Sequence, residues 1–222
     1  FSSNKVQNKI KKDIIMKGFK ELKIVWNEIK LNIKLKQFLF AFFIYSTALQ
    51  TVMLVATYFG EEEIQWASQS EKTIGLILSI LLIQIVAILG SFLAAKSSSH
   101  FGNLKTLIVI NLIWGVLCLI AFFIKTPMQF YFVAGFVGLV MGALQPLSRS
   151  TFSKFMPETN DTASYFSFYG VTEKIAIIIG MFLFGFIDQI TGSMRNSILP
   201  FLFFFILGAY LLLRISKKFD TN

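Results

Sequence analysis

Six long apolar runs are the feature that most constrains the fold of this chain. Each holds roughly 20 residues, which is the length that a helix needs to cross the hydrocarbon core of a bilayer. Inside a bilayer the backbone must satisfy its own hydrogen bonds, and a helix does so within a single run. The pattern predicts an all-α polytopic membrane protein with six transmembrane helices, at about residues 38–59, 74–95, 106–124, 128–147, 171–190 and 197–213.

The composition supports helices in lipid. Of the 222 residues, 55% are hydrophobic and 15% are charged, whereas about 25% of the residues in a soluble domain are charged. The chain also contains 26 phenylalanines, which suit surfaces that face lipid or pack between helices. These proportions argue against a soluble globular fold.

The basic residues predict how the chain crosses the membrane. The net charge is +9, which by itself is compatible with a nucleic-acid-binding protein. Ten lysines precede Gln37, however, and most of the other basic residues fall in alternate loops. Such an asymmetry follows the positive-inside rule, so we expect both termini in the cytoplasm and no nucleic-acid partner.

The lysine-rich segment 1–37 precedes the first span. Its apolar residues recur three, four and seven positions apart, a spacing typical of one face of a helix. One interpretation is an amphipathic helix on an anionic cytoplasmic surface, with Trp26 at headgroup depth. The alternative is a linker helix that packs on its own protein. We predict three parts: a cytoplasmic linker at 1–37, a six-helix bundle at 38–218 and a cytoplasmic tail at 219–222.

Residues for catalysis or for a cofactor are not apparent in the sequence. Cys118 is the only cysteine and lies in an apolar run, so it indicates neither an internal disulfide nor a Cys/His metal site. His100 is the only histidine and stands in a basic turn, with no serine nucleophile inside a span to serve. Phosphate-binding loops and paired carboxylates at catalytic spacing are absent as well. We expect no enzyme activity, no catalytic residues, no metal and no cofactor.

The fourth span carries three glycines on one face, Gly135, Gly138 and Gly142. In lipid, small residues at such spacing let two helices approach closely, so we predict that this face packs against another helix. The chain then reaches Pro146. There we expect the helix to end and a long cytoplasmic loop, residues 148–170, to begin.

Polar side chains near the centres of the spans are the candidates for a solute-binding site. They could bind a solute by hydrogen bonds, with a tryptophan as an apolar wall. The alternative is hydrogen bonding between helices, which contributes about 0.6 kcal/mol on average in a membrane protein. The candidate residues are Tyr45, Gln50, Gln84, Asn111 and Trp114.

Three charged residues near the expected cytoplasmic surface are candidates for gating or coupling: Arg149, Glu173 and Lys174. Arg149 can pair with Glu173 when the cytoplasmic face is closed and separate from it on opening; the alternative is a static anchor at the interface. A glutamate at a helix start is favoured by the helix dipole. If Glu173 lies deeper in the bilayer, it becomes the best candidate for proton coupling. On the other side, Asp188 is expected to cap its helix or to pair with Arg195.

The order of spans and basic turns resembles the C-terminal half of a major facilitator superfamily transporter, a fold with two six-helix halves. The lysine-rich opening then corresponds to the cytoplasmic linker between the halves. The turn KSSSHFGNLK, residues 96–105, stands where the superfamily carries a gating turn. Gly102 and Lys105 fit that turn, while serines stand in place of its usual acidic residue.

A narrower resemblance covers Gly142 to Ile198. The core QPLSRSTFSKFMPE, the aromatic run after it and the later GSMRNS turn are similar to a family that groups with the fungal vacuolar amino-acid effluxers of autophagy. The resemblance implies a secondary transporter that moves an amino acid or a similar small solute by alternating access. It also implies the bilayer, a missing N-terminal six-helix half and a proton or other coupling ion as partners.

Two architectures are compatible with these features. We expect this chain to be the C-terminal half of a longer twelve-helix transporter, because it opens with Phe1 and a segment that is similar to a linker. The alternative is a complete six-helix membrane protein that acts as a dimeric small transporter or as a non-transporting scaffold. The chain is rich in Ile, Lys and Phe, which favours a bacterial source and hence a location in the bacterial cytoplasmic membrane.

Overall fold

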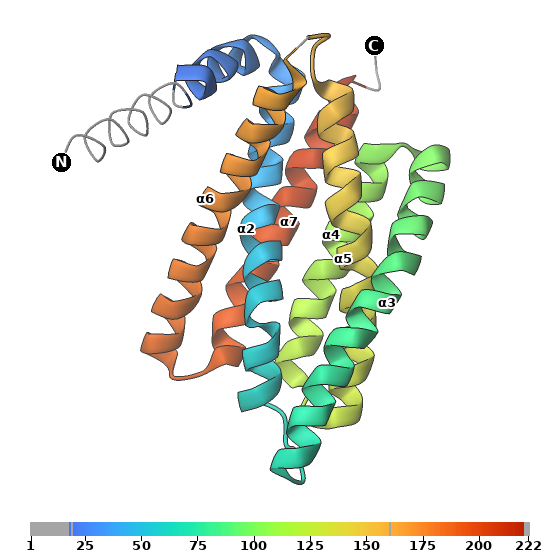
Figure 1. The fold of residues 1–222 in the computed structure, drawn as a ribbon, viewed down its shortest axis with the longest axis vertical. Coiled ribbons are helices and arrows are strands. Elements are labelled where there is room, and N and C mark those ends of the chain that lie inside the picture. Colours follow the sequence, from blue (N-terminus) through green and yellow to red (C-terminus); the bar gives the residue numbers. More distant parts are fainter. Residues whose placement is uncertain (1–17, 19, 160, 220–222) are drawn as a thin grey trace, which may run out of the picture.

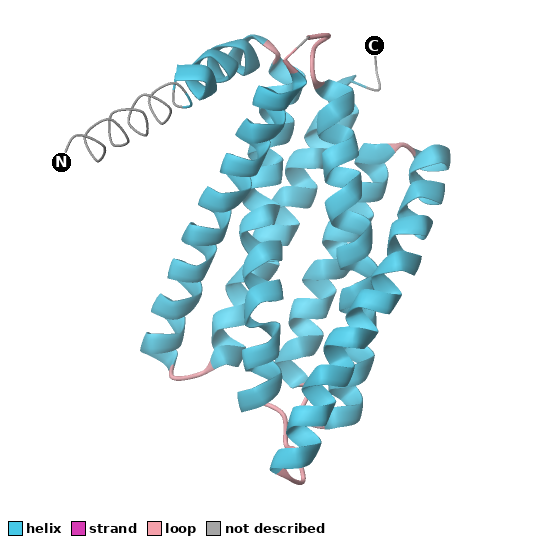
Figure 2. Ribbon diagram, viewed as in Figure 1, coloured by secondary structure: helices cyan, strands magenta, loops and turns pink. Residues whose placement is uncertain are grey.

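In the computed structural model, the described residues are 18, 20–159 and 161–219. Within these ranges the chain is helical with short turns and no strand (Figure 2). A helical stretch over residues 20–31, called here the leading helix, precedes six helices long and apolar enough to cross a membrane. These are α2 (Ile33–Glu62), α3 (Gln69–Phe101), α4 (Asn103–Phe123), α5 (Pro127–Phe155), α6 (Thr162–Thr191) and α7 (Met194–Phe219).

The helices form one bundle in which α6 and α3 lie at the two edges (Figure 1). Between them, α2 packs on α6 and α7, α4 packs on α7 and α5, and α3 packs on α5. The leading helix, the α3–α4 and α5–α6 turns and the last turns of α7 lie at one end of the bundle, called here the basic end (Figure 1). The expectation of an all-α fold with six spans is confirmed.

Local sequence signals set where most helices begin. The side chain of Asn32 accepts a hydrogen bond from the backbone N–H of Leu35, and Ser68 and Asp161 cap α3 and α6 in the same way. Thr126 and Gln129 form a capping box around Pro127, whose missing N–H is no loss at the first helical position. Such caps satisfy backbone donors that a helix start leaves free.

The expected helix end at Pro146 is wrong. Helix α5 continues through Pro146 to Phe155, and α6 begins at Thr162, so the connection covers only residues 156–161. Proline inside a helix costs about 3 kcal/mol. The residues after it keep the helical period, and four of them are buried in the bundle: Leu147, Ser148, Thr151 and Phe152. Their burial offsets the lost hydrogen bond.

The first boundary also differs from the prediction. Helix α2 begins at Ile33, so residues 33–37 belong to the first spanning helix and not to a separate linker. Asn32 separates it from the leading helix, whose axis takes a different direction from α2 (Figure 1). The parts of the predicted linker and tail at residues 1–17, 19 and 220–222 lie outside the described residues.

Two of the three glycines on α5 lie where its backbone meets that of α3. A Cβ atom built on Gly138 would lie 2.5 Å from the carbonyl oxygen of Ile83, and one on Gly142 would collide with the carbonyl oxygen of Ala87. Gly90 on α3 approaches the backbone of α5 equally closely. Gly135 has room for a side chain, because its nearest neighbour would be a leucine methyl group at 3.9 Å. Close packing therefore depends on Gly138 and Gly142.

Candidate functional site

Three polar side chains from three helices meet in the bundle: Gln50 of α2, Arg149 of α5 and Glu173 of α6. The amide nitrogen of Gln50 donates a hydrogen bond to Oε1 of Glu173. A guanidinium nitrogen of Arg149 lies 3.9 Å from Oε2 of the same carboxylate. We call this group the α2–α5–α6 triad.

The triad lies deeper in the bundle than expected for Glu173. Helix α6 begins at Thr162, so Glu173 stands roughly 17 Å along the helix axis and not in the first turn. Its partner Gln50 lies near the middle of α2. The Glu173 side chain is 18% exposed, whereas that of Arg149 is 64% exposed. The carboxylate is therefore mostly enclosed, whereas most of the arginine side chain lies at the surface.

An aromatic cluster closes the bundle between the triad and the basic end. The ring of Tyr169 stacks on Phe42 with centroids 4.1 Å apart and contacts Phe152 at 5.0 Å. Tyr45 is fully buried, and its hydroxyl lies 2.7 Å from the hydroxyl of Ser148. In this conformation Tyr45 joins α2 to α5 and offers no surface to a solute. The four rings come from the same three helices as the triad.

The other solute-site candidates do not gather around Gln50. Asn111 and Trp114 of α4 are fully buried, and Trp114 stacks on Phe205 of α7 with ring centroids 5.4 Å apart. Asn111 donates to the carbonyl oxygen of Leu107 in its own helix. Its side-chain oxygen and the indole N–H of Trp114 have no hydrogen-bond partner within the described residues.

Gln84 lies away from the packed face of its helix. Gln84 is exposed on α3. The buried residues of α3 are small ones, Gly75, Ser79, Gly90 and Ala94, and on this face Gly75 and Gly90 lie close to α5. Gln84 follows Ser79 by five positions, so a helix of 3.6 residues per turn directs it away from that face.

The α3–α4 turn at the basic end is built around Gly102. This glycine is both the last capping residue of α3 and the first of α4. Its φ of +84° is an angle that residues with a side chain rarely adopt. The next residue, Asn103, donates to Thr151 at 3.1 Å and accepts from Lys154 at 3.0 Å. The turn is thereby tied to α5. Lys105 and, farther along the chain, Lys174 are exposed.

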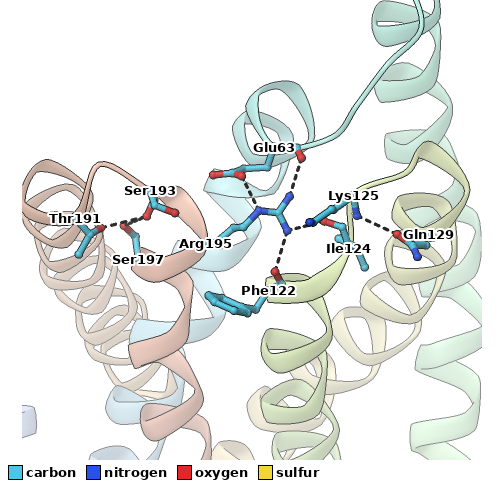
Figure 3. A network of polar contacts seen from close by, with 9 residues as sticks. All are labelled: Glu63, Phe122, Ile124, Lys125, Gln129, Thr191, Ser193, Arg195 and Ser197. Carbon is cyan, nitrogen blue, oxygen red and sulfur yellow. Dashed lines mark hydrogen bonds and ion pairs between the residues drawn. The ribbon is translucent and has the colours of Figure 1, made fainter.

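A second polar network, at the opposite end of the bundle, was not predicted (Figure 3). Arg195 at the start of α7 donates to the carboxylate of Glu63 at 2.6 Å and to the carbonyl oxygen of Glu63 at 2.7 Å. It also donates to the carbonyl oxygens of Phe122 and Ile124, which end α4. One guanidinium group therefore joins the ends of α2, α4 and α7. Of the two roles expected for Asp188, the pairing with Arg195 is wrong, because Arg195 contacts Glu63 and Asp188 accepts a hydrogen bond from Ser197.

Sequence comparison identifies the family. A family model described as "Vacuole effluxer Atg22 like" matches residues 2–219. The chain belongs to this family. It is 28% identical over 215 residues to the "Uncharacterized MFS-type transporter YxiO" of Bacillus subtilis, covering 96% of the chain and 49% of that protein. It is 31% identical over 182 residues to "Autophagy-related protein 22" of Saccharomyces cerevisiae, covering 77% of the chain and 33% of that protein.

The fold has a counterpart among solved structures. The fucose:proton symporter of E. coli matches with a TM-score of 0.68 at 19% identity, over 86% of this chain and 45% of the symporter. The Atg22-like chain therefore has the major facilitator fold, and it spans half or less of the length of these relatives. The relatives whose names state an activity are transporters and not enzymes, in agreement with the expectation for this chain.

Proposed function

We propose that the full-length protein is a secondary transporter that moves a small solute across the membrane by alternating access. In this proposal the present chain supplies the C-terminal six-helix half. Three observations support it: the chain belongs to the Atg22-like family, it has the major facilitator fold, and it spans half or less of the length of its relatives. The positive-inside pattern further supports cytoplasmic termini, with the basic end at the cytoplasm of a bacterial cell.

The α2–α5–α6 triad is the observation that carries the proposal. A charged residue in a membrane interior is costly and is usually functional. Glu173 has one partner that holds it in place, Gln50, and one exposed partner of opposite charge, Arg149. Protonation of Glu173 would remove the charge that attracts Arg149. The pair therefore provides a two-state element next to the aromatic cluster, which lies between the triad and the basic end.

The chemistry of the triad favours a solute that carries both charges. A carboxylate on the solute can pair with Arg149, and an ammonium group can pair with Glu173. A zwitterionic amino acid presents both groups a short distance apart, so it can enter between the two residues and separate them. We therefore propose amino acids as the first solute class to assay. Asn111, Trp114 and Gln84 have no part in this site.

Transport by the full-length protein in proteoliposomes tests the proposal. We expect uptake of an amino acid against its gradient when a proton gradient is applied. In Glu173→Gln the carboxylate is replaced by an amide that keeps the contact with Gln50. We expect this variant to exchange labelled for unlabelled solute but not to accumulate it. Glu61→Gln is a matched control, because Glu61 forms a partly exposed ion pair with Lys72, a pair that shares no residue with the α2–α5–α6 triad.

Two outcomes would contradict the proposal at different points. Full proton-driven accumulation by Glu173→Gln would remove Glu173 from coupling. The absence of exchange with any amino acid, in protein that is folded and inserted, would contradict the solute class.

A further inference from the structure

A groove of about 890 Å³ opens at the basic end, between the leading helix and the ends of α2, α6 and α7. Its volume lies in the range of roughly 300–1,000 Å³ that is typical of ligand pockets. It shares no residue with the α2–α5–α6 triad. The groove is therefore a separate feature, which the proposed transport mechanism does not use.

The walls of the groove are apolar and come from four elements. Phe40 and Phe43 lie on α2, Phe168 on α6 and Leu211 on α7. Trp26 of the leading helix stacks on Phe168 with ring centroids 5.6 Å apart and bounds the groove on that side. Phe40 is 57% exposed although it is large and apolar. Such a surface is suited to cover by hydrocarbon.

The rim of the groove is cationic. Lys36 at the start of α2 and Arg214, Lys217 and Lys218 at the end of α7 line it, and no acidic side chain is among the described residues that do. Basic residues at the end of a transmembrane helix attract anionic lipid headgroups. Long basic side chains at this level also keep their charge at the interface while their stems lie along apolar surface.

Apolar walls beneath a cationic rim match an anionic amphiphile. We propose that the groove binds an anionic phospholipid, with its phosphate at Arg214, Lys217 and Lys36 and its acyl chains along Phe40 and Phe43. A bound lipid would join the leading helix to α2 and α7. This site depends on the membrane location of the chain but not on its transport activity.

Fluorescence of Trp26 provides a direct test. The full-length protein is placed in bilayers of phosphatidylcholine that contain a small fraction of brominated lipid, either phosphatidylglycerol or phosphatidylcholine. Bromine quenches tryptophan at contact, and subtracting the signal of Trp26→Phe isolates the response of Trp26. We expect brominated phosphatidylglycerol to quench Trp26 severalfold more than brominated phosphatidylcholine at the same fraction.

Two paired variants test the role of the rim. Arg214→Gln combined with Lys217→Gln removes two charges from the rim, and we expect the preference for the anionic lipid to disappear. Lys20→Gln combined with Lys23→Gln removes two charges from the leading helix at positions outside the groove, and we expect the preference to remain.

The opposite results would overturn the site. Equal quenching by both lipids would show that the groove does not select an anionic lipid, as expected if the upstream half of the protein covers it. Equal loss of preference in both paired variants would show only a general attraction between a basic surface and anionic membranes. Folding of each variant is checked by its thermal unfolding, so a lost preference cannot be mistaken for a lost fold.

Discussion

At the scale of single residues, the main observation is how Glu173 is held. Placing a carboxylate at the centre of a transmembrane helix costs about 3 kcal/mol on insertion scales. Gln50 and Arg149 offset part of this cost by donating to, or lying near, its two oxygens. The 3.9 Å separation from Arg149 and the exposure of that arginine make this ion pair the weaker of the two contacts.

Exchanging the two charges tests whether this pair acts as a gate. We expect Arg149→Glu alone and Glu173→Arg alone each to abolish transport, because each leaves two like charges facing one another. The double variant restores opposite charges, and we expect it to recover part of the exchange of labelled solute. Absence of any recovery in folded double variant would contradict the pairing.

Arg195 is the second residue whose partners give it a clear role. Its side chain is 15% exposed and that of Glu63 is 21% exposed, so the pair is largely enclosed. Removing one partner of a fully buried pair costs 3–5 kcal/mol, and for Arg195→Gln we expect roughly 2–4 kcal/mol because of the partial exposure. Thermal unfolding of the full-length protein in detergent measures this. Lys125→Gln removes an exposed cation at the same end and should leave the midpoint nearly unchanged.

At the scale of helices, packing against a neighbour decides features that a single helix leaves open. On α5, the sequence alone does not distinguish Gly135 from Gly142, because both stand on the same apolar face of the helix. Only Gly142 meets a backbone at short range, because α3 and α5 cross near it. Beyond Pro146, α5 stays helical where its side chains contact other helices, as Ser148 does with Tyr45 of α2 and Phe152 with Tyr169 of α6.

A pair of alanine variants distinguishes these two glycines. In Gly142→Ala the new methyl group would collide with the carbonyl oxygen of Ala87, and we expect a destabilisation of about 1–3 kcal/mol. In Gly135→Ala the methyl group fits, and the higher helix propensity of alanine should stabilise by up to about 1 kcal/mol. Denaturation of the two proteins in detergent compares them. Equal stabilities would mean that α3 and α5 do not cross at this point.

At the scale of the whole molecule, the two edge helices are only partly covered. For each helix, the buried share of the most apolar stretch measures this cover: it is 11% in α3 and 17% in α6, compared with 61% in α2. Both helices therefore present long apolar faces to their surroundings. A twelve-helix arrangement would cover part of these faces with a second half, whereas a six-helix protein would leave them to lipid or to a second copy.

The mass of the native protein separates these architectures. An antibody against the segment that begins at Arg214 detects the protein in its own membranes, and we expect a band at roughly twice the 25.2 kDa of this chain. A band near 25 kDa would favour the six-helix alternative and would direct the next experiment to cross-linking between copies.

Features that depend on short stretches of sequence could be predicted, and features that depend on contacts between helices could not. The spans follow from apolar runs, and their starts from caps such as Thr126 with Gln129. The apolar run predicts a helix start at residue 171, nine residues after the observed start at Thr162, and so places Glu173 in the first turn. The aromatic residues before it, Tyr165 and Tyr169, are buried helix residues and not part of a loop. The Arg195 network joins segments more than 70 residues apart in the sequence, and the helical spacing of residues within one segment does not predict contacts between such segments.

The sequence by itself determined that this chain is a bundle of membrane helices, because twenty apolar residues in lipid have one way to satisfy their backbone. It also marked Arg149 and Glu173 as residues to examine. Only the tertiary structure decided their depth, the hydrogen bond from Gln50 to Glu173 and which glycines are essential to packing. The physical reason is that side chains from different helices meet according to where the helices cross, and that crossing depends on the packing of all six together.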